Sequence, residues 1–317
     1  MSSRIVYIGA PEADALQFET RVRRDFPEID LFSTNDRNAV LNALSNTEVL
    51  IGHHFQFDDA LLNSVPKLRW IQSLTTGTDA ILKLSTLRSD VLITSTRGMH
   101  GPQMSELVFL HMLSLARNFP KILENQKQNI WERWPQALLF NKVVVIVGVG
   151  AISEALASRC KAFGMTVIGI TSSERAVPGF DQILKREQLK IAAAVADFMV
   201  LVIPLTADTH NIIDSSILDA MKPDAYLINV ARGGVLDEDA LVSALRRKRL
   251  AGAALDVFKE QPLPAQSPLW QELNLTISPL LGGMSNIYLE QAYPIVRRNL
   301  ELFLDNAFHE MINLVPH

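Results

Sequence analysis

Short apolar runs rich in β-branched residues alternate along this chain with stretches in which apolar residues recur every three to four positions. Before residue 100 the first pattern predicts strands at 5–8, 49–52, 68–74 and 91–94, and the second predicts a helix at 13–24. Alternation of strands and helices is typical of a parallel sheet with crossover helices. The N-terminal hundred residues are therefore expected to form a small parallel sheet.

A second alternating region follows residue 142. Its strand-like segments lie at 143–147, 166–170, 198–203, 226–230, 252–256 and 275–278. Six such segments with helices between them predict a complete doubly wound domain. Residues 102–119 are apolar on more than one face of a helix, which is typical of a helix buried between domains or subunits. Residues 288–305 predict a helix that returns to pack on the first domain.

Composition narrows the class of protein. The chain has 317 residues, 48% of them hydrophobic and 20% charged, enough to bury the cores of two domains. The net charge of -4, with no basic block, gives no electrostatic reason to expect a nucleic acid or a membrane surface as partner. The longest apolar run, 191–205, is interrupted by Asp197 and is too short to span a bilayer, so we expect it to be buried core.

The number of cysteines and the character of the N-terminal residues indicate in which cellular compartment the protein is located. The single cysteine, Cys160, allows no internal disulfide, and no Cys/His cluster predicts a metal site. Residues 5–8 read as a strand and not as the apolar segment of an export signal. These features favour the cytoplasm and a small-molecule ligand.

A glycine motif stands where the second alternating region begins. The β-branched strand 143–147 runs into Gly148, Gly150 and Ser153, and then into a helix rich in alanine and leucine. This context is that of a dinucleotide site: one glycine permits the tight turn, and the next lets the backbone approach a pyrophosphate. The N–H groups of the first helical turn, at Ala151 and Ile152, then point at the anion. The alternative is a strand, turn and helix that bind nothing.

The end of the next strand indicates which dinucleotide is bound. An NAD site usually has an acidic residue there, about twenty residues beyond the glycines. This chain has Thr171, Ser172, Ser173, Glu174 and Arg175. Hydroxyl groups and an arginine suit a 2′-phosphate, so the sequence favours NADP. NAD stays possible because of Glu174.

Several further motifs occur in a fixed order. They are Thr-Gly-Thr-Asp at 76–79, Ser-Glu at 105–106, Pro-Leu-Thr at 204–206 with Thr209, Asn-Val-Ala-Arg-Gly-Gly at 229–234, Ala-Leu-Asp-Val-Phe at 254–258 and Gln-Pro-Leu-Pro at 261–264. Together they make the chain, from about residue 49 to 315, resemble the D-2-hydroxyacid dehydrogenases, with the glyoxylate and hydroxypyruvate reductases among them.

This resemblance implies an α/β fold with two doubly wound parallel-sheet domains, a Rossmann cofactor domain inserted into a flavodoxin-like substrate domain. The substrate domain would comprise 1–100 and 285–317, and the cofactor domain 101–284. It also implies an active site in the cleft, a homodimer formed through the cofactor domain, and hydride transfer from NAD(P)H to a small 2-keto acid.

Residue roles follow from the same resemblance. Arg232 matches the arginine that binds the substrate carboxylate and polarises the keto group through its planar guanidinium. Thr75, Thr76 and Gly77 match the substrate-carboxylate loop, and Asp256 matches an aspartate on the nicotinamide side. The remaining matched cofactor contacts are Pro204, Thr209, Val230 and Ala231. For Arg232 the alternative is an ordinary surface arginine at a strand end.

Two positions depart from the family pattern. The family's proton relay is a glutamate before Pro-Leu-Pro and a histidine after the last strand's Ser-Pro, and this chain has Gln261 and Leu280 there. Leucine cannot carry a proton, and a positioned general acid typically contributes about 10² to 10⁴ in rate. Their joint loss is self-consistent, because a glutamate without its histidine would be a charge without a partner.

Two hypotheses are compatible with these residues. One is an NADP-preferring keto-acid reductase with a weak relay, or with a proton donor moved to His53, His54 or His100; for any one of these three, an ordinary histidine that satisfies loop hydrogen bonds or faces solvent is the favoured interpretation. The other is a catalytically silent dinucleotide-binding sensor or partner switch. The enzyme is favoured because Arg232 and the carboxylate loop are retained, which a cofactor sensor would not require.

Overall fold

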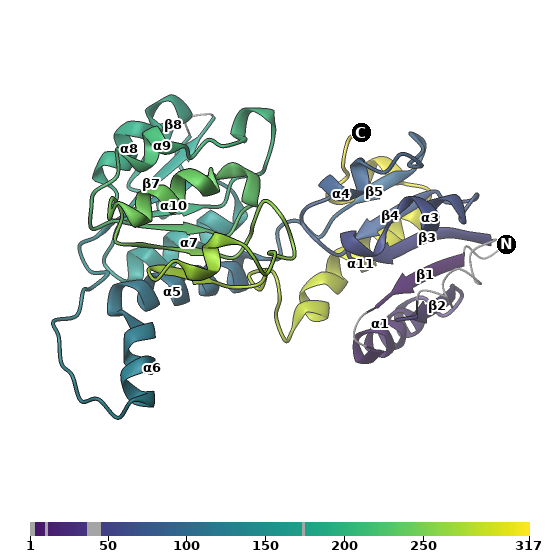
Figure 1. Cartoon of the computed structure of the whole chain (residues 1–317). Helices are drawn as coiled ribbons and strands as arrows, with labels where there is room; N and C mark the ends of the chain where they lie inside the picture. Colours follow the sequence, from purple (N-terminus) through teal and green to yellow (C-terminus); the bar gives the residue numbers. More distant parts are fainter. Residues whose placement is uncertain (1–3, 10–11, 37–45, 173–174) are drawn as a thin grey trace. The chain divides into compact units, whose positions relative to one another are not determined.

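The computed structural model describes residues 4–9, 12–36, 46–172 and 175–317, and it divides the chain into two compact units (Figure 1). Unit 1 comprises Met1–Met99 and Ser285–His317, and unit 2 comprises His100–Met284. Unit 2 is therefore an insertion in the sequence of unit 1. Both units are α/β folds built on a parallel sheet.

Unit 1 is built on five parallel strands in the order β2-β1-β3-β4-β5. The strands are β1 (Arg4–Ile8), β2 (Asp30–Thr34), β3 (Thr47–Gly52), β4 (Trp70–Ser73) and β5 (Leu92–Thr94). The helices are α1 (Glu12–Asp25), α3 (Asp59–Asn63), α4 (Asp79–Leu82) and α11 (Tyr288–Leu304), with short 3₁₀ turns η2 (His54–Gln56) and η7 (Phe308–Glu310). Strand β2, which the sequence pattern did not predict, lies at the edge of the sheet.

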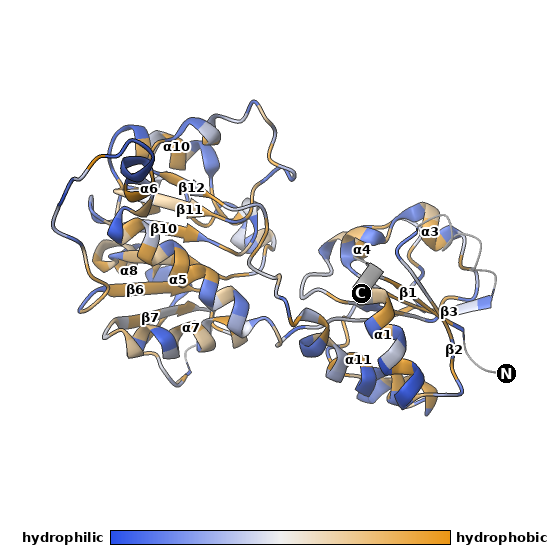
Figure 2. Ribbon diagram, turned by 90° about the horizontal axis from the view of Figure 1, so that it is seen from below, coloured by the Kyte–Doolittle hydropathy of each residue, from blue (hydrophilic) through white to orange (hydrophobic). Residues whose placement is uncertain are grey.

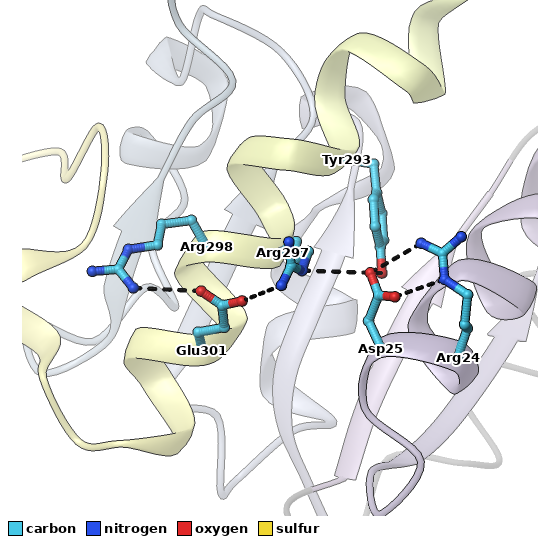
Figure 3. A network of polar contacts seen from close by, with 6 residues as sticks. All are labelled: Arg24, Asp25, Tyr293, Arg297, Arg298 and Glu301. Carbon is cyan, nitrogen blue, oxygen red and sulfur yellow. Dashed lines mark hydrogen bonds and ion pairs between the residues drawn. The ribbon is translucent and has the colours of Figure 1, made fainter.

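Helix α11 packs against α1, as its apolar pattern predicted. Its buried Val296 and Leu300 belong to the same core cluster as Phe18 of α1. A polar network joins the two helices at the surface (Figure 3). Asp25, at the end of α1, accepts a hydrogen bond from Tyr293 Oη at 2.9 Å and forms an ion pair with Arg297 at 3.5 Å. The C-terminal segment is thus tied to the N-terminal sheet by both packing and charge.

Unit 2 is built on seven parallel strands in the order β12-β11-β10-β9-β6-β7-β8. The strands are β6 (Val143–Val147), β7 (Thr166–Thr171), β8 (Gln182–Lys185), β9 (Phe198–Leu201), β10 (Tyr226–Asn229), β11 (Gly252–Leu255) and β12 (Leu275–Ile277). The helices are α5 (Gly101–Arg117), α6 (Phe119–Lys127), α7 (Ala151–Ala162), α8 (Leu189–Val195), α9 (Ser215–Leu218) and α10 (Glu238–Arg246), with 3₁₀ turns η3 (Arg186–Gln188), η4 (Ala207–Thr209), η5 (Gly233–Val235) and η6 (Pro268–Gln271). The strands of this sheet are mainly apolar, while the helices carry hydrophilic residues as well (Figure 2).

The topology of unit 2 positions a ligand site. Strand order reverses between β6 and β9, which pair in parallel, and ligands of open α/β sheets bind outside the carboxyl ends of the strands at such a switch point. The glycine motif follows β6 directly.

Two expectations about unit 2 need correction. The pattern predicted six strands, but β8 adds a seventh at the sheet edge. Residues 191–205 are not buried throughout: β9 is fully buried, whereas Ile191 and Val195 of α8 are 67% and 43% exposed. The part of this run that belongs to α8 is therefore exposed to solvent on one face of the helix and buried on the other. Among the described residues, no helix combines the length and apolar character needed to cross a bilayer.

Candidate functional site

The loops that carry most of the predicted site residues all leave the same edge of the seven-stranded sheet. Because its strands are parallel, the segments after β6, β9, β10, β11 and β12 begin at one carboxyl edge. These segments hold the glycine motif, the Pro204 loop, Arg232, Asp256 and Leu280, in that order. One edge therefore gathers groups that are far apart in the sequence.

The two glycines after β6 have different roles. Gly148 has φ 103°, and a Cβ there would lie 2.9 Å from backbone atoms of Val202 and Ile203. Its lack of a side chain is a requirement of the fold. Gly150 has an extended backbone, and a Cβ there would meet nothing within 4 Å. The open space beside Gly150, at the N-terminus of α7, fits a pyrophosphate group.

Ser153 replaces the third glycine and acts through its hydroxyl group. The Gly150 N–H donates to Ser153 Oγ at 2.6 Å, and Oγ donates to the Gly150 carbonyl at 2.8 Å. The side chain is buried and closes the loop onto the first turn of α7. An anion bound here would therefore use the next N–H groups, those of Ala151 and Ile152. The sequence had suggested only that serine is small enough for this position.

The end of β7 carries the groups predicted to select the cofactor. Thr171 is half-buried at the strand end and Ser172 is exposed. Arg175 reaches back to the glycine loop, where Nη2 donates to the Val149 carbonyl at 3.4 Å. It also forms an exposed ion pair with Glu154 at 3.8 Å, a weak interaction in water. Ser173 and Glu174 lie outside the described residues.

Thr209 shapes the loop after β9. Its hydroxyl accepts from the Thr206 N–H and donates to the Pro204 carbonyl, both at 2.7 Å, and the side chain is buried. The hydroxyl is thus used within its own loop. Any contribution of Thr209 to a cofactor site comes through the shape of residues 204–209.

Arg232 lies on a turn that Asn229 holds in place. Asn229, fully buried at the end of β10, accepts from the Ala231 N–H at 3.0 Å and donates to the Arg232 carbonyl at 3.1 Å. The half-buried guanidinium donates to the Ala231 carbonyl at 2.7 Å. A Cβ on Gly233 would lie 1.9 Å from the backbone of Phe258, so glycine is required there. The buried backbone of Val230 and Ala231 completes this turn; the sequence showed the motif but not the positioning role of Asn229.

Asp256 holds the loop that follows β12. Its buried carboxylate accepts from Ser278 Oγ at 2.6 Å and from the N–H groups of Leu281 and Gly282 at 2.8 and 2.9 Å. Because Ser278 donates to Asp256, it accepts from His111 Nε2, 3.2 Å away on α5. Burial lowers the pKa of His111, and the charge of Asp256 partly opposes this effect. The carboxylate predicted to lie near the nicotinamide is bonded to the loop of residues 278–282, which follows the next strand, through partners that the sequence did not reveal.

The two departures from the family's relay lie on neighbouring loops. Leu280 has φ 57°, a left-handed conformation that is costly for a bulky residue, and its side chain is 49% exposed. Its N–H donates to the Asp256 carbonyl at 3.0 Å. Gln261, also exposed, follows the adjacent strand β11. Neither side chain can supply a proton.

The loop after β4 in unit 1 holds the predicted carboxylate-binding residues. Thr75 Oγ1 donates to the Gly77 carbonyl at 2.9 Å and lies 2.9 Å from Ser73 Oγ, while Thr76 is exposed. Tyr288 Oη of α11 donates to the Leu74 carbonyl. The loop is therefore fixed at its start and presents Thr76 to solvent.

Two of the three candidate histidines lie beside this loop. His54 Nδ1 lies 3.1 Å from Thr75 Oγ1. The ring of His53 lies 5.4 Å from that of Phe55 and 5.5 Å from that of Tyr288, centroid to centroid. Burial, with the charge of His54 as a second cause, lowers the pKa of His53 to about 4. His100, in unit 2, is 6% exposed and is the N-cap residue of α5.

Comparison with known proteins gives consistent matches. Residues 109–282 match the profile of the D-isomer specific 2-hydroxyacid dehydrogenase, NAD binding domain. A glyoxylate/hydroxypyruvate reductase B of Pectobacterium carotovorum is 31% identical over 266 residues, 82% of each chain. A D-isomer specific 2-hydroxyacid dehydrogenase family protein of Aeromonas salmonicida has a solved structure that superposes with a TM-score of 0.92, at 33% identity, over 99% of both chains. An NADPH-dependent glyoxylate/hydroxypyruvate reductase of Sinorhizobium meliloti, solved with NADP and sulfate, shares the fold at 23% identity over 99% of this chain and 98% of its own, with a TM-score of 0.86.

Proposed function

The chain belongs to the D-isomer specific 2-hydroxyacid dehydrogenase family, and we propose that it reduces a small 2-keto acid to the 2-hydroxy acid with NADPH, NADH being the weaker cofactor. The observation that carries the proposal is that one sheet edge holds both an open glycine loop and a rigidly positioned arginine. The glyoxylate and hydroxypyruvate reductases among the relatives support this substrate class.

The cofactor would be held by unit 2. The backbone of Gly150, Ala151 and Ile152 would receive the pyrophosphate, while Thr171, Ser172 and Arg175 would receive the 2′-phosphate. The bound nicotinamide supplies hydride. Arg175 already lies against the glycine loop, and its exposed ion pair with Glu154 costs little to break.

The substrate would be recognised by charge and hydrogen bonding. Arg232 would bind the carboxylate and polarise the keto group, assisted by Thr75, Thr76 and Gly77. Asn229 keeps the backbone of the arginine turn fixed, which favours a preorganised site.

Proton delivery would differ from that of the family. Gln261 and Leu280 carry no ionisable group, so the usual relay is absent and turnover would be slower. The same feature supports the second candidate, a catalytically silent sensor in which dinucleotide binding controls a partner. The retained arginine and carboxylate loop favour the enzyme.

A homodimer formed through unit 2 is part of this proposal. The exposed apolar side chains that follow α5 support it: Phe119, Ile122, Leu123, Ile130, Trp131, Leu138 and Phe140. Trp131 is 93% exposed. These residues belong to α6 and the segment after it, which extend from the rest of unit 2 (Figure 1). Apolar side chains gathered on one segment mark an interaction surface.

We also propose that the protein is cytoplasmic, because a chain with a single cysteine forms no internal disulfide, as is usual in a reducing compartment. The cysteine, Cys160, is buried, and burial raises the pKa of its thiol to about 12, so we expect it to act as a packing residue.

Two measurements test the proposed function. Calorimetric titration should give tighter binding of NADPH than of NADH. Absorbance at the NADPH band should then fall when glyoxylate, hydroxypyruvate or phenylpyruvate is added. Binding without turnover, for any of these acids and for variants with a restored relay, would favour the sensor.

A further inference from the structure

We propose that His111 is a positioning residue for the nicotinamide end of the cofactor site, because it holds the loop of residues 278–282 in place through Ser278 and Asp256. The inference rests on the proposed binding of NADPH by unit 2. His111 lies on the buried face of α5, and all three residues belong to unit 2. The argument therefore depends on contacts within one compact unit.

Strand order indicates at which end of the cofactor site this loop lies. The assigned 2′-phosphate site follows β7, and the assigned pyrophosphate site follows the neighbouring strand β6. Beyond β6 the sheet continues through β9, β10 and β11 to β12. A dinucleotide bound across this edge, with its adenosine half at β7, would extend its nicotinamide half toward the segments that follow β10, β11 and β12. The loop of residues 278–282 follows β12 directly.

The loop is held from two sides. After β11, the buried Asp256 carboxylate accepts from Ser278 Oγ at 2.6 Å and from two backbone N–H groups of the loop at 2.8 and 2.9 Å. On α5, His111 Nε2 lies 3.2 Å from Ser278 Oγ. A Cβ on Gly282 would lie 2.8 Å from Met104 Sδ, so α5 also packs closely against the end of the loop.

The direction of the hydrogen bonds assigns the hydrogen of the imidazole. A carboxylate only accepts, so the Ser278 hydroxyl donates its one hydrogen to Asp256 and accepts from His111. Burial lowers the pKa of His111, while the charge of Asp256 partly opposes this effect, so the ring is neutral at neutral pH and carries its hydrogen on Nε2. His111 thus donates from the helix into the loop.

The loop also carries backbone strain. Leu280 has φ 57°, a left-handed conformation that is costly for a bulky residue, and its N–H donates to the Asp256 carbonyl at 3.0 Å. Strained backbone persists only where the surrounding structure holds it, and it is typical of ligand sites. Loss of the bond from His111 should change the loop before it changes the sheet, because β12 keeps its pairing with β11.

The test compares two ligands that differ by the nicotinamide ring. NADPH and 2′-phospho-ADP-ribose share the 2′-phosphate, the pyrophosphate and both riboses. In calorimetric titrations, His111→Leu should weaken NADPH binding at least about fivefold and leave binding of 2′-phospho-ADP-ribose within about twofold. The amide nitrogen of His111→Gln reaches about as far as Nε2, so this variant should restore NADPH affinity to within about twofold of wild type.

Two further variants separate positioning from stability. Val108→Ala, at a fully buried position one turn earlier on α5, removes packing but no side-chain hydrogen bond, so it should change the two affinities by the same factor. Ser278→Ala removes the link between His111 and Asp256. Adding His111→Leu to Ser278→Ala should then weaken NADPH binding by less than about twofold more, because both substitutions break the same connection.

The outcomes distinguish this inference from the proposed function. Unchanged affinities in His111→Leu, equal losses of both ligands, or a loss that His111→Gln does not restore would overturn the positioning role and leave cofactor binding intact. Equal affinity of the wild type for the two ligands would do the same, because the nicotinamide would then gain nothing from the loop. A wild type that binds neither ligand would overturn the proposed function, and the inference with it.

Discussion

Replacing Gly150 with valine should abolish dinucleotide binding and leave unit 2 folded. The backbone of Gly150 is extended, a conformation that any residue adopts, and a Cβ would meet no atom within 4 Å. The folding cost is therefore modest, about 1 kcal/mol, because Gly150 is the N-cap residue of α7 and valine is a poorer N-cap. The branched side chain would instead fill the space assigned to the pyrophosphate. We expect affinity for NADPH to fall by at least about 100-fold, or about 2.7 kcal/mol.

Gly148→Ala is the matched control, because Gly150→Val should lower the affinity for NADPH, whereas Gly148→Ala should lower the stability of the fold. Here the added Cβ would lie 2.9 Å from the backbone of Val202 and Ile203, and φ is 103°. Backbone strain of about 1–3 kcal/mol and overpacking of a similar size predict a loss of roughly 2–6 kcal/mol in the free energy of unfolding. Thermal denaturation and calorimetric NADPH titration of both variants provide the assay. Unchanged affinity in Gly150→Val, with the fold intact, would show that this loop is not the phosphate site.

Three further predictions concern stability and positioning. Hydrogen bonding from Arg24 lowers the pKa of Asp25. The ionised carboxylate therefore stabilises the fold above the ordinary carboxyl pKa, and this stability is lost as pH falls below about 4. In Asp25→Asn, the melting temperature should consequently fall less steeply over this acidic range than in wild type. The folded pKa of His53 lies near 4, below its ordinary 6.5, so stability should decline as pH falls through this interval, by at most about 3 kcal/mol; urea titrations at several pH values should show a larger decline in wild type than in His53→Asn, where the buried His111 still contributes. Asn229→Ala should cost about 1–3 kcal/mol and raise KM for the keto acid, because two backbone groups of the turn lose their partner; an unchanged KM would separate Asn229 from substrate binding.

The sequence predicted the fold class because most strands are buried and apolar. The two strands it missed, β2 and β8, are edge strands. Each has only two adjacent apolar residues between polar ones, and nearly all of their side chains are at least partly exposed. An edge strand can be short of apolar residues, and hydrophobic periodicity then does not reveal it, although it did reveal the other two edge strands, β5 and β12.

The parts of the candidate site that consist of consecutive residues in a motif were predictable from the sequence. The parts that depend on hydrogen bonds between residues far apart in the sequence were not. The glycine loop and the arginine turn are read from consecutive residues. The contact between His111 and Ser278 spans 167 positions, and no local pattern indicates it. The sequence did assign the tight turn to Gly148 and the approach of a pyrophosphate to Gly150, but only the packing of Gly148 against Val202 and Ile203 shows why the fold itself requires a glycine there.

The sharpest test of the account is keto-acid reduction by wild type, Leu280→His, Gln261→Glu and the double variant, measured as NADPH oxidation. Position 280 has φ 57°, which histidine tolerates better than leucine, so Leu280→His should fold at least as well as wild type. The double variant should be faster than wild type by at least about tenfold, His alone should gain less, and Glu alone should gain little. A double variant no faster than an active wild type would contradict the account, because it would show that the missing relay does not limit this enzyme.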